Sequence, residues 1–219
     1  MEAKPDFKSM STQKKIGYVW DYYRLHIGIT IILAIIIGSA IHHFVTTKDS
    51  VLDMIFMNSY SPYEGPQGLD EFFLSQGFDA KKEEISIATS LNFAITDDGY
   101  EPDYYTLQSL DAMFAVGDVD IFAAPQQIYS DYSIAGYVAD LRTVFTDEEL
   151  NAYKELLLYA TTFDTQETIP CGFDFSNNGW LLEYEYYSGN CHMGIPANAD
   201  NPELAKEFLL YLLQYEENH

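Results

Sequence analysis

Basic residues are scarce in this sequence: 11 Lys and Arg stand against 34 Asp and Glu among 219 residues, for a formal net charge of −23. A nucleic-acid partner is therefore not expected, because binding to the phosphate backbone relies on clustered Lys and Arg. Cysteine is scarce too, and two cysteines cannot by themselves supply a disulfide scaffold or a four-ligand zinc site. The 47% of hydrophobic residues is too high for a disordered acidic tail, so the charge must cover a packed core.

Sequence motifs of catalysis are missing as well. The chain has no Gly-x-Ser-x-Gly or His-Glu-x-x-His segment and no glycine-rich phosphate loop. Cys191 and His192 form the one adjacent Cys–His pair, and neighbouring residues on a strand point to opposite faces, so they would not act together. The close carboxylate pairs do not fit the twelve-residue calcium loop. We therefore expect neither an enzyme nor a bound metal or cofactor.

A long apolar stretch lies near the start of the chain. Residues 25–45 include no Asp, Glu, Lys or Arg. As a helix with a rise of 1.5 Å per residue, this stretch would be about 31 Å long, which matches the hydrocarbon core of a bilayer. Trp20, Tyr22 and Tyr23 precede it, where aromatic residues of a membrane interface are expected. The stretch is predicted to be a single membrane-spanning helix.

The charges around this stretch indicate its orientation. Five Lys and Arg precede it, which by the positive-inside rule places the N-terminus in the cytoplasm. The predicted organisation is a basic cytoplasmic tail over residues 1–24, a transmembrane helix over 25–47 and an extracytoplasmic domain over 48–219. That domain holds six Lys and Arg against 31 Asp and Glu. The alternative is a signal peptide cleaved after Ala40, although the apolar run continues past Ala40 and favours an uncleaved anchor.

Hydrophobic patterns beyond residue 48 alternate between strands and helices. The nearly continuous apolar run at 51–57 is typical of a strand buried on both faces of a sheet, and residues 85–91 alternate with a period of two. The predicted strands are 51–57, 85–91 and 118–123, and the predicted helices are 69–75 and a segment capped by Asp103 and Gly117. This order predicts an α/β fold with helices on both faces of the sheet.

The second half of the domain has weaker patterns. Residues 125–136 are predicted to be helical, and Thr146 and Glu149 form a capping box that opens a helix through about residue 160. Short strands are expected at 168–175 and 191–195. A final helix begins at Pro202 and carries an apolar stripe.

Two segments suggest a known family. Within residues 107–150 a helix ends in GDVD at 117–120, and a later helix leads to the turn GYVADL at 136–141; the chain then closes on an IPANADNPELAKEFLLYLL helix. Both resemble extracellular solute-binding proteins of the type 2 periplasmic-binding-protein fold. The resemblance implies binding of a solute between two α/β lobes, but about 170 residues build mostly one lobe. The chain therefore looks like a small membrane-anchored relative, from a Gram-positive bacterium, with a spanning helix in place of a lipoprotein anchor.

Candidate ligand-binding residues follow the first three predicted strands. Ligands of open α/β sheets bind beyond the carboxyl ends of the strands. The polar residues at these ends are Asn58, Ser59, Tyr60, Ser90, Asn92, Gln126 and Gln127. They would hydrogen-bond a neutral polar solute such as a sugar or a peptide. Candidate stacking surfaces are Tyr60, Tyr63, Tyr129 and Trp180. The alternative, that these are turn, cap and core residues, stays open.

The two cysteines also leave two interpretations. Cys171 and Cys191 fall on the predicted strands 168–175 and 191–195, outside the membrane. A disulfide between them would close a loop of about 20 residues and stabilise the fold by about 3 kcal/mol in the chain-entropy model. Two free buried thiols are the alternative, because the sequence does not give the separation of the Cα atoms.

These features predict a membrane-tethered extracytoplasmic binding module that serves a transporter as an accessory or acts as a sensor. The alternative is a structural or assembly subunit that docks another membrane protein and takes no small-molecule ligand. A cytoplasmic tail of about 24 residues is too short for an enzyme or transporter domain. Both interpretations therefore require a membrane-protein partner.

Overall fold

The computed structural model describes residues 11–46, 48–61, 66–97 and 99–218 of the chain. Some side chains within these ranges are not described, namely those at positions 14, 16, 18, 19, 21, 22, 40–46 and 216–218. The chain divides into two compact units, Met1–Thr47 and Lys48–His219. Each unit is described by itself below.

The first unit contains one long helix, α1 (Thr12–Thr46). Its described apolar side chains are exposed around the helix, as at Leu25 (70%), Ile29 (57%) and Ile35 (65%). Among the helical residues whose side chains the structure describes, no stretch is long and apolar enough to cross a membrane. The predicted span, residues 25–47, and the alternative cleavage site after Ala40 extend into residues 40–47, whose side chains lie outside the described part. Both stay predictions.

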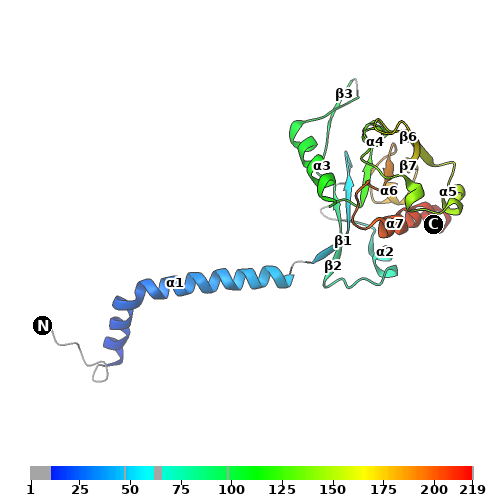
Figure 1. The fold of residues 1–219 in the computed structure, drawn as a ribbon. Helices are drawn as coiled ribbons and strands as arrows, with labels where there is room; N and C mark the ends of the chain where they lie inside the picture. Colours follow the sequence, from blue (N-terminus) through cyan, green and yellow to red (C-terminus); the bar gives the residue numbers. More distant parts are fainter. Residues whose placement is uncertain (1–10, 47, 62–65, 98, 219) are drawn as a thin grey trace. The chain divides into compact units, whose positions relative to one another are not determined.

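The second unit is built on a six-stranded mixed sheet with the order β2-β1-β5-β8-β7-β6 (Figure 1). The strands are β1 (Asp49–Phe56), β2 (Glu83–Ala88), β5 (Ile121–Ala124), β6 (Leu157–Thr161), β7 (Thr168–Asp174) and β8 (His192–Gly194). Strand β1 pairs in parallel with β2 and β5, whereas β8 is antiparallel to both β5 and β7, and β7 is antiparallel to β6. The α/β fold predicted from the sequence is confirmed.

Strand β1 and the residue after it bury apolar side chains on both faces of the sheet. Because side chains alternate across a strand, Leu52 and Met54 belong to a hydrophobic cluster on one face, and Ile55 and Met57 belong to a cluster on the other face. All four side chains are at most 1% exposed. The second half of the strand is therefore mostly apolar, with Asp53 as a part-exposed exception.

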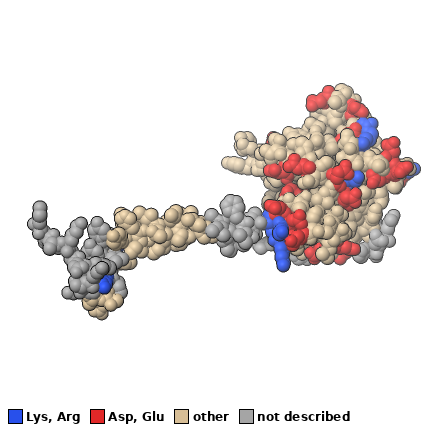
Figure 2. All heavy atoms as spheres, turned by 60° about the horizontal axis from the view of Figure 1, so that its bottom comes forward, with Lys and Arg blue, Asp and Glu red and all other residues tan. Residues whose placement is uncertain are grey.

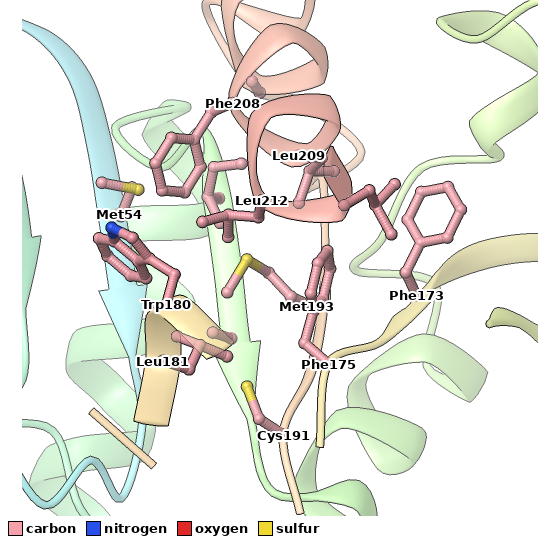
Figure 3. Packing of buried hydrophobic residues seen from close by; sticks show 14 of the residues in the cluster. Met54, Phe173, Phe175, Trp180, Leu181, Cys191, Met193, Phe208, Leu209 and Leu212 are labelled. Carbon is pink, nitrogen blue, oxygen red and sulfur yellow. The ribbon is translucent and has the colours of Figure 1, made fainter. Parts of the chain in front are cut away.

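Helices cover both faces of the sheet, as the strand–helix order predicts. The first face is covered by α2 (Asp70–Ser75), the 3-10 turn η2 (Leu141–Thr143), α5 (Asp147–Ala152), α6 (Gly179–Glu183) and α7 (Pro202–Asn218). In Figure 3, Phe208, Leu209 and Leu212 of α7 point toward the strands and toward Trp180 of α6. The other face is covered by α3 (Tyr104–Val116) and α4 (Gln126–Ile134).

The capping residues predicted for α3 and α5 are confirmed. The carboxylate of Asp103 accepts hydrogen bonds from the backbone N–H groups of Tyr105 (3.0 Å) and Thr106 (3.1 Å) at the start of α3. Gly117 ends the same helix in the left-handed conformation, with φ of 83°. The capping box of Thr146 and Glu149 is formed at the start of α5.

The fold departs from the prediction at one predicted helix and contains two further features that were not predicted. Helix α5 ends at Ala152, so the helix predicted through about residue 160 is wrong, and residues 157–161 form the edge strand β6. An apolar run this short fits a helix or a strand, and pairing with β7 decides between them. The sequence also gave no sign of α6 or of the hairpin formed by β3 (Ala94–Thr96) and β4 (Gly99–Glu101).

Candidate functional site

The parallel strands β1, β2 and β5 end at one edge of the sheet, where the candidate binding residues were predicted. Asn58 follows β1 in a left-handed conformation, with φ of 52°. Its side-chain amide donates to the carbonyl of Phe93 (2.8 Å), and its side-chain oxygen accepts from the N–H of Phe93 (3.0 Å). This amide therefore fastens the loop after β2, and both of its polar atoms are occupied.

The next two residues are tied to a distant segment. The hydroxyl of Ser59 donates to the carbonyl of Tyr186 (2.9 Å), and the N–H of Tyr60 donates to the same oxygen (2.9 Å). The side chain of Tyr60 is 61% exposed. Ser90 and Asn92 are also exposed, and the backbone carbonyl of Asn92 accepts from the hydroxyl of Thr106 (3.5 Å). Asn58 and Ser59 thus make the contacts of turn residues, which was the alternative to ligand binding at these positions.

Gln126 and Gln127 occupy the first turn of α4, directly after β5, and both are exposed. The side chain of Asn190 caps this helix end, because its oxygen accepts from the N–H of Gln126 (2.8 Å). The Gln127 amide lies against Gly99 of the β3–β4 hairpin, where an added Cβ would come within 2.5 Å of its Oε1. Gly99 also has a φ of +125°, so the contact depends on glycine.

Two of the four candidate stacking residues belong to the core. Tyr129 is 1% exposed, and its hydroxyl donates to the carbonyl of Cys171 (2.7 Å). Burial raises the pKa of the Tyr129 hydroxyl well above its usual value. Trp180 is fully buried, and its Nε1 donates to the carbonyl of Gly68 (2.9 Å). Tyr63 lies outside the described residues.

The two cysteines are buried free thiols. Cys171 belongs to the hydrophobic cluster on one face of the sheet and Cys191 to the cluster on the other. The sheet thus separates the two sulfur atoms, and the possible disulfide is not formed. Burial is the main cause of the raised pKa of both thiols, which keeps them protonated and unreactive.

A pocket of about 320 Å³ opens beside this edge of the sheet, between α3, α4 and the β3–β4 hairpin. Its walls include residues of all three elements and of the flanking segments, among them Phe93, Tyr100, Asp111, Gln127, Asp131, Tyr132 and Tyr137. A second hollow of about 360 Å³ shares some of these residues and is lined by Tyr100, Gln126, Gln127, Ser130, Asp131 and Asn190. Of the seven predicted binding residues, Gln126 and Gln127 line these hollows.

Two tyrosine hydroxyl groups are among the polar groups of the pocket. Tyr132 is 7% exposed, and its hydroxyl is buried without a hydrogen-bond partner among the described residues. Burial, reinforced by the nearby carboxylate of Asp111, raises the pKa of Tyr132 to about 12. The hydroxyl of Tyr137 donates to Oδ1 of Asp111 (3.0 Å), which raises the pKa of Tyr137. Both phenols therefore stay neutral at neutral pH.

Sequence reasoning missed Tyr100, Asp111, Asp131, Tyr132 and Tyr137. These residues lie on two helices, on a hairpin and, in the case of Tyr137, in the segment after α4, and local periodicity does not encode how these parts pack together. The one available signal was the tyrosine-rich segment at 129–137, directly after the strand β5. Comparisons of the chain with protein-family models, with curated proteins and with solved structures found no match.

Proposed function

We propose that the chain is a single-pass membrane protein whose extracytoplasmic α/β domain is a binding module, not an enzyme. Its ligand would be held in the pocket between α3, α4 and the β3–β4 hairpin, on behalf of a transporter or a sensor in the same membrane. The observation that carries the proposal is this pocket, with the partnerless buried hydroxyl of Tyr132 in its wall.

The pocket supports ligand binding in two ways. Its volume of about 320 Å³ is at the lower end of the range of small-molecule sites in proteins, which are concave and mostly apolar with few polar groups. A buried hydroxyl without a partner costs free energy, so native proteins rarely keep one without a compensating role. A ligand that hydrogen-bonds the Tyr132 oxygen would recover that free energy. The site also adjoins the carboxyl ends of β1, β2 and β5, where ligands of open α/β sheets bind.

The membrane tether is supported by the first unit. The uncharged run at residues 25–45 is long enough for a bilayer core. The described side chains from Leu25 to Ile37 expose apolar groups on every side of α1. A helix that is apolar all round is buried in a core or in a membrane. The basic residues before this run support a cytoplasmic N-terminus.

The choice of a transporter accessory or sensor rests on the resemblance of residues 107–150 and of the final helix to solute-binding proteins. A partner in the same membrane would convert ligand binding into transport or a signal. The described part of the domain has one six-stranded sheet beside the two-stranded β3–β4 hairpin, as a one-lobed relative of that family would have one main sheet.

The test is the thermal unfolding of the full-length chain in detergent micelles against a panel of sugars, amino acids, peptides and amines. A ligand at 100 times its Kd adds about 2.7 kcal/mol. For a domain of this size the shift is several degrees. We expect one compound class to produce the shift, and Ala135→Phe, in the pocket wall, to abolish it.

The matched control is Ala112→Phe, an equally large substitution at an exposed position of α3 outside the pocket. This variant should keep the full shift. A flat response across the panel from a cooperatively folded chain would overturn the proposal. So would a ligand-induced shift that survives Ala135→Phe unchanged, because the binding site would then lie elsewhere.

A second candidate, the assembly subunit without a ligand, is favoured by large apolar side chains that are exposed on the hairpin and at the start of α3. Ile95 of the hairpin and Tyr104 and Tyr105 of α3 are 67%, 71% and 79% exposed. Aromatic residues at such positions are typical of protein–protein contacts. Under this candidate, Tyr105→Ser would release a partner that co-purifies with the native chain, whereas Ala135→Phe would leave that complex intact.

A further inference from the structure

The pocket between α3, α4 and the hairpin has walls rich in aromatic rings. Tyr132 and Tyr137 contact each other there, with ring centroids 5.2 Å apart and planes inclined by 54°. Phe93 and Tyr100 line the same space from the loop after β2 and from the hairpin. The face of an aromatic ring carries partial negative charge and attracts cations, most strongly where water is excluded.

Two carboxylates line the same space from different helices. Asp111 lies on α3 and Asp131 on α4. No Lys, Arg or His lines the pocket in the described part of the chain, and neither carboxylate forms an ion pair with a described basic residue. Within the described part of the chain, no basic side chain therefore neutralises the negative charge of these walls.

The hydrogen-bonding groups point to the same ligand chemistry. The Tyr137 hydroxyl uses its proton on Asp111, so its oxygen is left with acceptor capacity only. The buried hydroxyl of Tyr132 has no partner among the described residues, and its oxygen can accept as well. Together with the two carboxylates, these groups favour a ligand that donates hydrogen bonds and carries positive charge. An anion would be repelled.

The charge of the whole domain acts in the same direction. Residues 48–219 carry six Lys and Arg against 31 Asp and Glu. Figure 2 shows Asp and Glu spread over the visible face, with few Lys and Arg between them. Such a field concentrates cations near the surface and speeds their association. The described residues contain no group of three His, Cys, Asp or Glu side chains suited to a metal ion, so the walls favour an organic cation over a bare metal ion.

We propose that this pocket binds an organic cation that can donate a hydrogen bond, either a primary ammonium compound or a quaternary ammonium compound with a hydroxyl group, between its aromatic walls and the carboxylates of Asp111 and Asp131. The inference rests on the proposed function, because it names the ligand class of the same pocket. The aromatic faces would hold the apolar substituents of the cation. The carboxylates would neutralise its charge, and the Tyr132 oxygen would gain the partner that it lacks.

The test compares each cation with a neutral molecule of the same shape. The probes are choline against 3,3-dimethylbutan-1-ol, and butane-1,4-diamine against butane-1,4-diol, titrated by calorimetry into the full-length chain in micelles. We expect at least one cation to bind about tenfold more tightly than its neutral counterpart, since ring faces and a partly exposed carboxylate each contribute to the difference.

Two variants localise the effect. Asp111→Asn keeps an acceptor for the Tyr137 hydroxyl and should weaken cation binding about fivefold while leaving the neutral probe unchanged. Asp164→Asn is the matched control, because it removes one negative charge at an exposed turn outside the pocket. This control should leave the Kd of the cation unchanged.

The outcomes separate this inference from the proposed function. If no cation binds more tightly than its neutral counterpart, while another compound of the panel binds and depends on Ala135, the inference is wrong and the binding module stands. If Asp111→Asn and Asp164→Asn have equal effects, the cations respond to the overall charge and the inference is also wrong. If no compound of any class binds, both proposals fall.

Discussion

Two buried tyrosines on the same helix differ in whether their hydroxyl groups have a hydrogen-bond partner among the described residues. Tyr129 and Tyr132 lie three residues apart on α4 and are 1% and 7% exposed. The Tyr129 hydroxyl donates to the carbonyl of Cys171 at 2.7 Å, whereas the Tyr132 hydroxyl has no partner among the described residues. Replacing each tyrosine by phenylalanine removes one hydroxyl and changes little else.

The two substitutions should have opposite effects on the free energy of unfolding. Tyr129→Phe deletes a buried hydrogen bond and leaves the Cys171 carbonyl without this donor, at a cost of about 1.5 kcal/mol. Tyr132→Phe removes a buried hydroxyl that has lost its water without gaining a partner, so stability should rise by about 1 kcal/mol. At about 3 °C per kcal/mol for a domain of this size, the two melting temperatures should differ by about 7 °C.

The measurement is thermal and urea unfolding of both variants and of the native chain, without ligand, followed by circular dichroism. Equal slopes against urea concentration would show that the variants unfold from the same kind of state. If Tyr132→Phe destabilises the chain as much as Tyr129→Phe does, the Tyr132 hydroxyl has a partner in solution. The main support for a ligand site in this pocket would then be lost.

Three further predictions concern other parts of the chain. Burial lowers the pKa of His192 although Asp174 is nearby, so the unfolded chain takes up a proton at a higher pH than the folded chain does. The stability of the native chain should therefore fall as the pH drops below about 6.5, and it should fall less steeply in His192→Gln. If the difference between the urea midpoints of the two chains is the same at pH 7.5 and at pH 5.5, this prediction is wrong. Gly117→Ala should cost about 1 to 2 kcal/mol in urea unfolding, because φ is +83° and a Cβ would lie 2.9 Å from the carbonyl of Asn198; an unchanged midpoint would refute it. The full-length chain should stay in the membrane pellet after an alkaline carbonate wash, whereas release into the supernatant would count against the tether at residues 25–45.

Those features of the fold that depend on neighbouring residues could be read from the sequence. The capping residues Asp103 and Thr146 form hydrogen bonds within three positions along the chain, so their residue types suffice to identify the helix starts. The strand at 51–57 was visible because burial on both faces favours a nearly continuous apolar run, which Asp53 alone interrupts. Strand β6 could not be recognised, because its partner β7 lies beyond a turn and the apolar residues Leu156 to Leu158 also fit a helix.

The site was accessible to sequence reasoning only in part. Gln126 and Gln127 could be found because residues that follow a parallel strand always lie at its carboxyl edge. Asp111 and Tyr132 could not, since they lie on different helices and the distance between those helices depends on how both pack on the sheet. Asn58 was correctly placed at the edge, but its hydrogen bonds to Phe93 depend on a loop conformation that the sequence does not specify.

The position of β8 in the sheet has a consequence for the order in which the domain can be completed. This strand of three residues, His192–Gly194, follows every other described strand in the sequence and leaves the ribosome after them, yet it lies between β5 and β7 and joins the parallel strands to the β7–β6 pair. Until it emerges, the two parts of the sheet have no strand between them and their open edges remain unpaired. A chain released before residue 194 would therefore expose two incomplete half-sheets, a state prone to aggregation.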